Sequence, residues 1–293
     1  MNSEKNIFIF GAGYSGKAFA KASPGSDTVF GTTRSAEKFE ALRRAGITPL
    51  PFGGMLTGEI EAALTHTTHL VVSIAPGEAG DPVLSAARDF IAEKMPALRW
   101  IGYLSTVGVY GDRGGGWVDE TGECRPLSNR SAMRAEAEQA WLALGLRIGR
   151  PVAVLRLSGI YGPGRNAFVN LRNGTAKRLI KPGQVFNRIH RDDIAGVLKH
   201  LADSGRGGVF NVTDDFPCPP QDLVTYAARL MGVEPPPEIP FETAQLSPMA
   251  RSFYAENKRV SNQAIKQAGY RFSFPDYRSA LDRMWADGSW ENE

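Results

Sequence analysis

Apolar runs of strand length alternate with segments of helical character through the first half of the chain. The apolar runs are Asn6–Phe10, Thr28–Thr32, Ile47–Phe52, His69–Ala75 and Trp100–Leu104. The segments of helical character between them are Ser15–Ala22, Ala36–Ala45, Glu59–Leu64 and Pro82–Met95. This alternation predicts an α/β fold, in which a doubly wound parallel sheet of the Rossmann type is covered by helices on both faces.

The alternation continues for one more helix, Ser128–Leu144, and one more strand, Pro151–Leu157. After Tyr161 prolines and glycines become frequent. The elements predicted there are short helices near Asp192–Ala202 and Gln221–Met231 and a strand at Gly208–Val212. We therefore expect a nucleotide-binding domain over residues 1–163, with its sheet completed by segments around 185–215. A small lobe, mainly over 164–293, is expected to bind the substrate.

Composition and charge exclude several classes of protein. The formal net charge is only +3 over 293 residues, and basic and acidic side chains are interspersed, which argues against a nucleic-acid partner. No segment approaches the roughly 18 apolar residues of a membrane span, and the first apolar run ends in a glycine turn, unlike a signal peptide. We expect a cytoplasmic protein. Cys124 and Cys218 lack metal-ligand spacing and are expected to be reduced thiols, so no metal site is predicted.

A Gly-x-Gly-x-x-Gly motif follows the first predicted strand and opens the first predicted helix. Gly11 permits a tight turn, Gly13 lets the backbone approach a pyrophosphate, and Gly16 lets the helix pack against the strand. Tyr14 and Ser15 stand at the start of the helix, where free N–H groups and a partial positive charge favour phosphate. The motif alone is weak, but its place between strand and helix predicts a dinucleotide site.

The end of the second strand bears on the choice of cofactor. An NAD enzyme usually has Asp or Glu there for the ribose 2′-hydroxyl, whereas this chain has Thr33-Arg34-Ser35, and Asp27 lies at the wrong end of the strand. Arg34 suits a 2′-phosphate, and Thr33 and Ser35 add hydroxyl donors. The three residues therefore favour NADP(H) over NAD, although NAD stays possible. The alternative for Arg34 is that it only caps a surface helix.

The turn after the fourth strand is also expected to pass the cofactor. It consists of Ser73, Ile74 and Ala75, followed by Pro76-Gly77. Small residues and a proline turn suit a segment beside a dinucleotide. They are equally typical of any strand-to-helix turn, so they only support the prediction.

Further motifs give the chain a resemblance to a known family. They are Ser105–Asp112 (STVGVYGD) with Asp119-Glu120 after it, Leu155–Gly164 (LRLSGIYGPG), Ile189–Ala195 (IHRDDIA) and Val209–Val212 (VFNV). In these, the chain resembles the extended short-chain dehydrogenases/reductases of the NAD(P)-dependent epimerase/dehydratase branch over almost its whole length. The resemblance implies the Rossmann fold, a nicotinamide cofactor and a serine strand followed by a substrate loop.

The chain departs from that family at the position of the usual acid and base. The resemblance implies Tyr-x-x-x-Lys on the long helix, but Arg130 and Arg134 occupy these two positions. At i, i+4 the two side chains share one helical face. A guanidinium with a pKa above about 12 does not exchange protons usefully near neutrality. The short glycine spacing also departs from the extended branch, and both changes resemble its atypical members.

The remaining chemistry is assigned to a few side chains. We expect Ser105 or Thr106 to orient a substrate carbonyl, Arg134 to replace the lysine at the nicotinamide ribose, and Arg130 to bind an anionic substrate group. Tyr110 and Tyr161 are the nearest substitute proton donors, although the family often has tyrosine there without catalytic use. His190 and a glycine loop before Trp117 are weaker candidates, as a base and as a closing loop.

Two functions stay open. The first is an NADP(H)-dependent oxidoreductase or epimerase-like enzyme acting on a small polar substrate. The second is a non-catalytic NADP(H)-binding redox sensor, which the missing tyrosine favours. The family resemblance also implies a homodimer, with Ala87–Met95 and Ala135–Leu144 as the expected interface helices.

Overall fold

The computed structural model describes residues 4–292, which form two compact units. Each unit is assembled from separate stretches of the chain. Unit 1 contains the residues up to Val109 together with Ser128–Leu157 and Ile194–Phe210. Unit 2 contains Tyr110–Leu127, Ser158–Asp193 and the residues from Asn211 onward.

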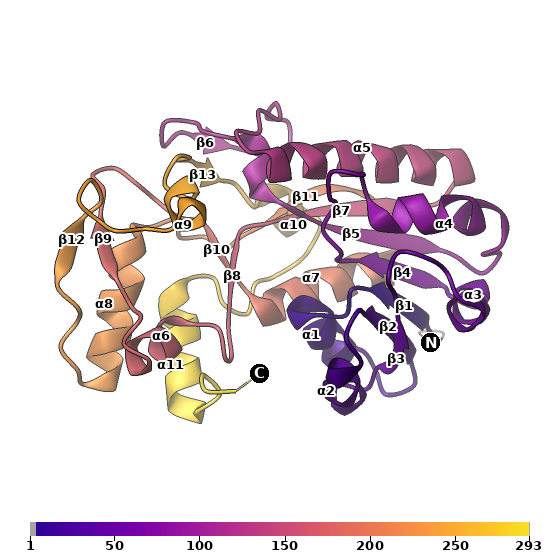
Figure 1. Ribbon diagram of the computed structural model, residues 1–293, viewed down its shortest axis with the longest axis horizontal. Helices are drawn as coiled ribbons and strands as arrows, with labels where there is room; N and C mark the ends of the chain where they lie inside the picture. The colour runs from indigo at the N-terminus through magenta and orange to yellow at the C-terminus, as the bar shows by residue number, and fades with distance from the viewer. Residues whose placement is uncertain (1–3, 293) are drawn as a thin grey trace. The chain divides into compact units, whose positions relative to one another are not determined.

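Unit 1 is built on a seven-stranded sheet in the order β3-β2-β1-β4-β5-β7-β11 (Figure 1). The strands are β1 Asn6–Phe10, β2 Thr28–Thr33, β3 Thr48–Pro51, β4 His69–Val72, β5 Trp100–Thr106, β7 Val152–Leu157 and β11 Gly208–Val212. Neighbouring strands from β3 through β7 pair in parallel. The order reverses between β1 and β4, and such a switch point is where open α/β sheets bind their ligands.

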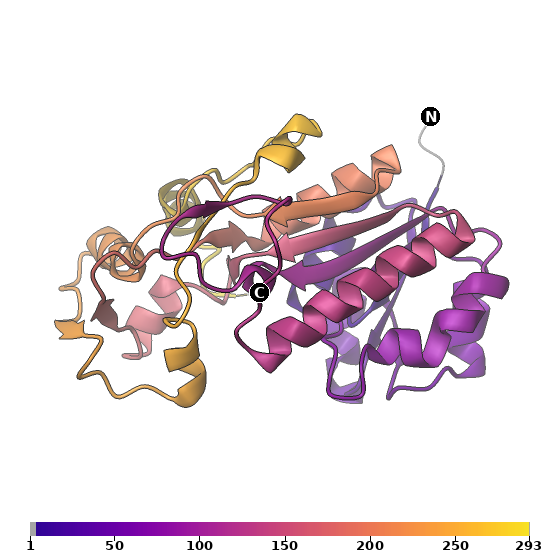
Figure 2. The ribbon, with the colours of Figure 1, turned by 90° about the horizontal axis from the view of Figure 1, so that it is seen from above.

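Helices cover both faces of this sheet. They are α1 Tyr14–Ala22, α2 Phe39–Arg44, α3 Gly58–Thr65, α4 Pro82–Glu93, α5 Asn129–Ile148 and α7 Arg191–Ser204. One face packs against α3, α4 and α5 around a core that includes Phe10, Tyr103 and Trp141. The other face meets α1 at Ile9 and α7 at Gly102, and Figure 2 shows α5 and α7 on opposite sides of the sheet. The predicted doubly wound Rossmann-type fold is confirmed.

In unit 1, one predicted helix and one predicted strand adopt another conformation over part of their length. The helix expected over Ala36–Ala45 is a 3-10 turn, Ala36–Lys38, followed by α2. The strand expected over His69–Ala75 ends at Val72. Ser73 N–H still donates to the Phe10 carbonyl, and the chain then leaves the sheet before Pro76, which has no N–H to donate to a ladder.

Unit 2 consists of short strand pairs and short helices. Its strands are β6 Trp117–Val118, β8 Gly159–Tyr161, β9 Arg178–Ile180, β10 Arg188–His190, β12 Glu238–Pro240 and β13 Arg259–Val260. They form three parallel pairs, β8 with β10, β9 with β12 and β6 with β13. Its helices are α6 Ala167–Arg172, α8 Pro220–Met231, α9 Pro248–Ser252, α10 Gln263–Gln267 and α11 Tyr277–Asp287. A core rich in aromatic side chains joins α6, α8 and α11.

Within residues 4–292, none of the helices combines the length and the apolar character that crossing a membrane requires.

Candidate functional site

The predicted cofactor residues meet at one edge of the sheet of unit 1. Gly11–Gly16 follow β1, Thr33–Ser35 end or follow β2, and Ser73–Ala75 follow β4. Since these strands are parallel, their carboxyl ends lie at the same edge. Ser73 N–H donates to the Phe10 carbonyl at 2.9 Å, which holds the turn after β4 against the end of β1. This edge is where a dinucleotide would bind in this fold.

The turn between β1 and α1 needs glycine at its first position. Gly11 has φ +80°, a conformation that L side chains rarely adopt. A Cβ there would also lie 2.7 Å from the Ile74 side chain. The turn is held further by Gly11 N–H donating to Thr32 Oγ1 and by Ala12 N–H donating to the Thr32 carbonyl, each at 2.9 Å.

The absence of a side chain at Gly13 and at Gly16 has a different consequence at each position. A Cβ at Gly16 would lie 3.2 Å from the Ile9 side chain, so this glycine lets α1 pack on β1. A Cβ at Gly13 would meet only the Gly11 carbonyl, at 4.0 Å. Gly13 is also the N-cap of α1, and no side chain caps that helix end. The first turn of the helix therefore presents backbone to the outside, as phosphate binding requires.

The end of β2 carries a cation and no carboxylate. Arg34 is exposed, and none of residues 4–292 forms an ion pair with it. Thr33 and Ser35 are half-buried on either side, and Ser35 N–H donates to Thr33 Oγ1 at 3.4 Å. The guanidinium is thus available for an anion at the position where the ribose of a dinucleotide would lie.

Ser105, at the end of β5, lies in a buried network. Its hydroxyl donates to Glu138 Oε1 at 2.5 Å, and Arg156 Nη2 lies 2.7 Å from Glu138 Oε2. Ser105 and Arg156 are each 4% exposed and Glu138 is 1% exposed. The network joins α5 to β5 and β7. Because the Ser105 hydroxyl donates its proton to Glu138, it has no proton left to donate to a ligand. Sequence reasoning missed Glu138, although its i, i+4 spacing from Arg134 places it on the helix face predicted to look inward.

Thr106, the next residue along β5, is more accessible. It is half-buried at the carboxyl end of the strand, and its Oγ1 accepts the Gly108 N–H at 3.1 Å. The hydroxyl proton has no acceptor among the described residues. Of the two predicted hydroxyls, Thr106 is therefore the one that can donate to a ligand.

The two arginines of α5 differ in their contacts. The helix begins after Ser128, whose Oγ accepts the Ser131 N–H at 3.2 Å. Arg130, in the first turn, is exposed. Arg134, one turn later, donates to the Leu104 carbonyl, and its guanidinium carbon lies 6.0 Å from the centroid of the Tyr103 ring. Arg134 is thus anchored to β5, while Arg130 extends from the start of the helix.

The other candidate acids and bases belong to unit 2 and are enclosed. Tyr110 is fully buried, and its hydroxyl donates to Asn211 Oδ1 at 2.8 Å. Burial raises the pKa of Tyr161 well above its ordinary value. Burial lowers the pKa of His190 to about 4, so its ring is neutral at pH 7. These shifts make Tyr161 and His190 poor proton donors near neutrality, and the Tyr110 hydroxyl already donates to Asn211.

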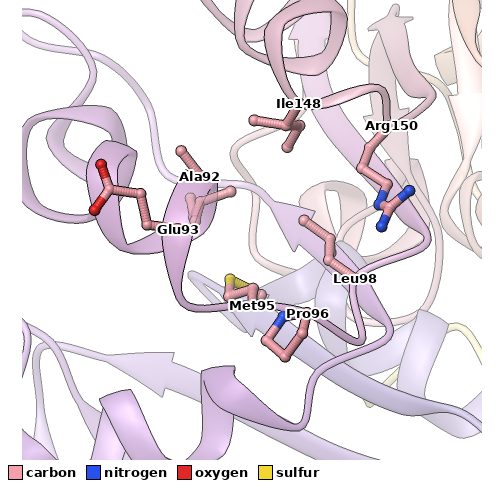
Figure 3. Close-up of a pocket in the computed structure, with 8 residues that line it drawn as sticks. Ala92, Glu93, Met95, Pro96, Leu98, Ile148 and Arg150 are labelled. Carbon is pink, nitrogen blue, oxygen red and sulfur yellow. The ribbon is translucent and has the colours of Figure 1, made fainter.

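A small pocket lies at the opposite edge of the unit 1 sheet (Figure 3). Its volume is about 120 Å³, and it is lined by residues from the end of α4 and from the segments that lead into β5 and β7: Ile91, Ala92, Glu93, Met95, Pro96, Leu98, Ile148 and Arg150. Because these segments precede their strands, the pocket lies away from the glycine turn. Among residues 4–292 there is no group of three or more His, Cys, Asp or Glu side chains that could hold a metal.

Comparison with known proteins gives relatives over nearly the whole chain. The chain is 46% identical to a functionally unknown conserved protein from Silicibacter pomeroyi DSS, with a TM-score of 0.88 over 96% of this chain and 98% of that one. It is 25% identical to a protein assigned as an NAD-dependent epimerase/dehydratase from Methylobacillus flagellatus, with a TM-score of 0.73 over 98% and 99%. No protein-family model matches.

Two further matches also cover nearly the whole chain. Protein YeeZ of Escherichia coli (strain K12) is 28% identical over 291 residues, which cover 93% of this chain and 97% of YeeZ. Human epimerase family protein SDR39U1, solved with NADPH, is 18% identical, with a TM-score of 0.69 over 96% of this chain and 99% of that one. At that identity, the human structure shows a shared fold alone.

The buried network around Glu138 generates a stability prediction. Glu138→Gln removes the charge opposite buried Arg156, so we expect the free energy of unfolding in urea to fall by about 3–5 kcal/mol. The double variant Glu138→Leu/Arg156→Met removes both charges and should lose much less than the two single changes combined. Glu136→Gln, exposed on the same helix, is the control. A loss below about 1 kcal/mol for Glu138→Gln would contradict the role given to the pair.

Proposed function

Because this chain belongs to one family with the Silicibacter pomeroyi protein and has the fold of the NAD-dependent epimerase/dehydratase-like short-chain dehydrogenases/reductases, we propose that it is an NADP(H)-dependent oxidoreductase. The observation that carries the proposal is Gly13, where a side chain would meet no close neighbour within the protein. The space above this glycine is what a pyrophosphate needs in order to reach the start of α1.

The preference for NADP(H) over NAD(H) rests on Arg34. A planar guanidinium binds a phosphate through two charge-assisted hydrogen bonds, and Arg34 is exposed without an ion-pair partner among the described residues. No carboxylate stands at the end of β2 to accept a hydrogen bond from a free 2′-hydroxyl. Structural neighbours were solved with NAD or with NADPH, so the preference for NADP(H) rests on Arg34 alone.

A nicotinamide bound at this edge would supply or accept a hydride. The side chains available to support that chemistry are Thr106, Arg130 and Arg134. Thr106 has a hydroxyl proton free to donate to a substrate carbonyl, and Arg130 is an exposed cation suited to an anionic group on a small polar substrate. Arg134 replaces the family lysine as the cation beside β5. In place of the family's tyrosine the chain has a guanidinium, which binds anions, so a carbonyl oxygen would take its proton from solvent.

A second function, a redox sensor that binds NADP(H) without turnover, is favoured by one observation. Arg130 occupies the position of the family's acid tyrosine. Tyr110 and Tyr161, the predicted substitute proton donors, are both buried. The two functions share the cofactor site and differ only in turnover.

Gly13→Ala tests the phosphate contact. The added methyl group has room within the protein, so we expect an unchanged melting temperature. It would occupy the space assigned to the pyrophosphate, so the Kd for NADPH in calorimetry should rise about tenfold or more. Gly25→Ala, in a turn where a Cβ would also meet nothing within 4 Å, should leave binding unchanged. Equal Kd values for the two variants would refute the contact.

Arg34→Ala tests the choice of cofactor. Loss of a charge-assisted bidentate contact should raise the Kd for NADPH about 10- to 100-fold and leave the Kd for NADH nearly unchanged. Arg44→Ala is the control, because Arg44 is exposed and paired with Glu40 on α2. If both cofactors lose affinity equally, Arg34 does not select the 2′-phosphate.

Thr106→Val tests turnover and separates the two functions. With NADPH and a panel of small aldehydes and ketones, an enzyme oxidises NADPH, and the variant should lower kcat/KM by about 100-fold because a donor to the carbonyl is lost. Thr65→Val should not, because Thr65 is the last residue of α3 and its hydroxyl donates to the Glu61 carbonyl of the same helix. Tight NADPH binding without oxidation by any substrate would support the sensor instead.

A further inference from the structure

A cavity of unit 2 lies at the strand pair β6-β13. Its volume is about 550 Å³, within the range of roughly 300–1,000 Å³ that is typical of small-molecule sites. It is lined by β6, by the loops on either side of that strand and by the residue that follows β13: Arg113, Trp117, Val118, Asp119, Gly122 and Ser261. All of these residues belong to unit 2.

The strand pair turns an aromatic ring and a carboxylate toward this cavity. The register pairs Val118 with Val260, and Ser261 N–H donates to the Val118 carbonyl at 2.8 Å. These two valines are 7% and 2% exposed, whereas Trp117 is 64% exposed. Since successive side chains of a strand alternate between its faces, Asp119 follows on the face of Trp117. The indole is therefore an open apolar surface beside a carboxylate.

The loop before β6 is fixed, and it holds Arg113 at the cavity. Arg113 N–H and Gly115 N–H both donate to the Asn257 carbonyl at 2.9 Å. The Arg113 side chain donates through Nη2 to the Glu123 carbonyl, while Nε and Nη1 have no partner within residues 4–292. The Glu123 carboxylate pairs with Arg125 instead, at 2.6 Å. The Arg113 cation thus has no ion-pair partner in the described chain.

Asp119 supplies the opposite charge. Its Oδ1 accepts the Thr121 hydroxyl at 2.6 Å and the Thr121 N–H at 2.9 Å. These hydrogen bonds lower the pKa of Asp119, so the group is a carboxylate at pH 7. Its Oδ2 has no partner among residues 4–292. Arg113 and Asp119 therefore line one cavity as opposite charges that do not form an ion pair with each other.

We propose that this cavity binds a zwitterionic α-amino acid with an aromatic side chain. The Arg113 guanidinium suits the carboxylate of such a ligand, and Asp119 suits its ammonium group. Trp117 offers a ring against which the aromatic side chain can stack. A zwitterion matches both charges, whereas a simple anion or a simple cation leaves one of them unmatched. None of these residues has a role in the proposed function, and the proposal does not depend on it.

The test uses the full chain at pH 7 without nicotinamide cofactor. Calorimetry measures the Kd of L-phenylalanine and of two analogues: 3-phenylpropionate, which lacks the ammonium group, and 2-phenylethylamine, which lacks the carboxylate. We expect saturable one-to-one binding of L-phenylalanine. Its Kd should be about tenfold or more below that of either analogue, because each analogue can form only one of the two charge-assisted contacts.

Three variants separate the contacts. Asp119→Asn keeps an oxygen acceptor for Thr121, and it should remove the advantage of L-phenylalanine over 3-phenylpropionate. Arg113→Gln should remove its advantage over 2-phenylethylamine. Trp117→Ala, a change at an exposed position, should raise the Kd of all three ligands because each of them carries the aromatic ring.

Asp287→Asn is the matched control. Asp287 is an exposed carboxylate at the end of α11 in the same unit, and its variant should bind L-phenylalanine with wild-type affinity. If Arg113→Gln fails to fold, Asp119→Asn and the two analogues decide. Any one of three results would overturn the site: no saturable binding of L-phenylalanine up to millimolar concentration, equal Kd values for L-phenylalanine and both analogues, or wild-type affinity in Asp119→Asn.

Discussion

The contact between the backbone of Gly11 and the side chain of Ile74 shapes the candidate cofactor site. Gly11 follows β1 and Ile74 follows β4, so their contact joins the two strand ends at the point where the strand order reverses. Any Cβ at Gly11 would meet Ile74, and the positive φ disfavours other residues as well. The turn can therefore stay tight, and α1 begins directly at the edge of the sheet with its first turn uncovered by a side chain. The proposal for the pyrophosphate depends on this arrangement.

A second constraint acts on α5, the helix that carries tyrosine and lysine in the resembling family. Here the helix is fixed to the sheet by the buried pair Glu138–Arg156 and by Arg134, which donates to the Leu104 carbonyl. The same helix face thus changes along its length from an exposed cation at Arg130 to a buried ion pair two turns later. Such a face can hold anions beside β5, but it lacks the tyrosine that the resembling family uses as its acid and base. The chemistry proposed for this chain therefore relies on the Thr106 hydroxyl and on solvent.

Much of unit 1 could be predicted from the sequence, because its buried parallel strands are continuous apolar runs that alternate with segments of helical length. The predicted strand Asn6–Phe10 has the bounds of β1, and the predicted helix Gln221–Met231 in unit 2 lacks only the first residue of α8. The small strand pairs of unit 2 were not predicted, since strands of two or three residues have no detectable alternation. The final helix, α11, was also missed, although Asp276 is a regular N-cap for it.

The candidate site also has a part that could be predicted from the sequence and a part that could not. Three segments could be placed at one edge of the sheet from the sequence: the glycine turn, Thr33–Ser35 and Ser73–Ala75. Each follows a predicted strand, and the carboxyl ends of parallel strands lie at the same edge. The roles of Ser105 and Thr106 could not be separated by sequence, since only the structure brings Glu138 to Ser105 across 33 residues.

Titration of the unaltered protein with each reduced nicotinamide cofactor, followed by calorimetry, tests the central claim most directly. The account predicts saturable one-to-one binding of both, with a Kd for NADPH at least roughly tenfold below that for NADH, since only NADPH carries the phosphate that Arg34 would bind. Absence of heat from either cofactor up to millimolar concentration would contradict the dinucleotide site. Equal affinities would contradict the part of the claim that rests on Arg34.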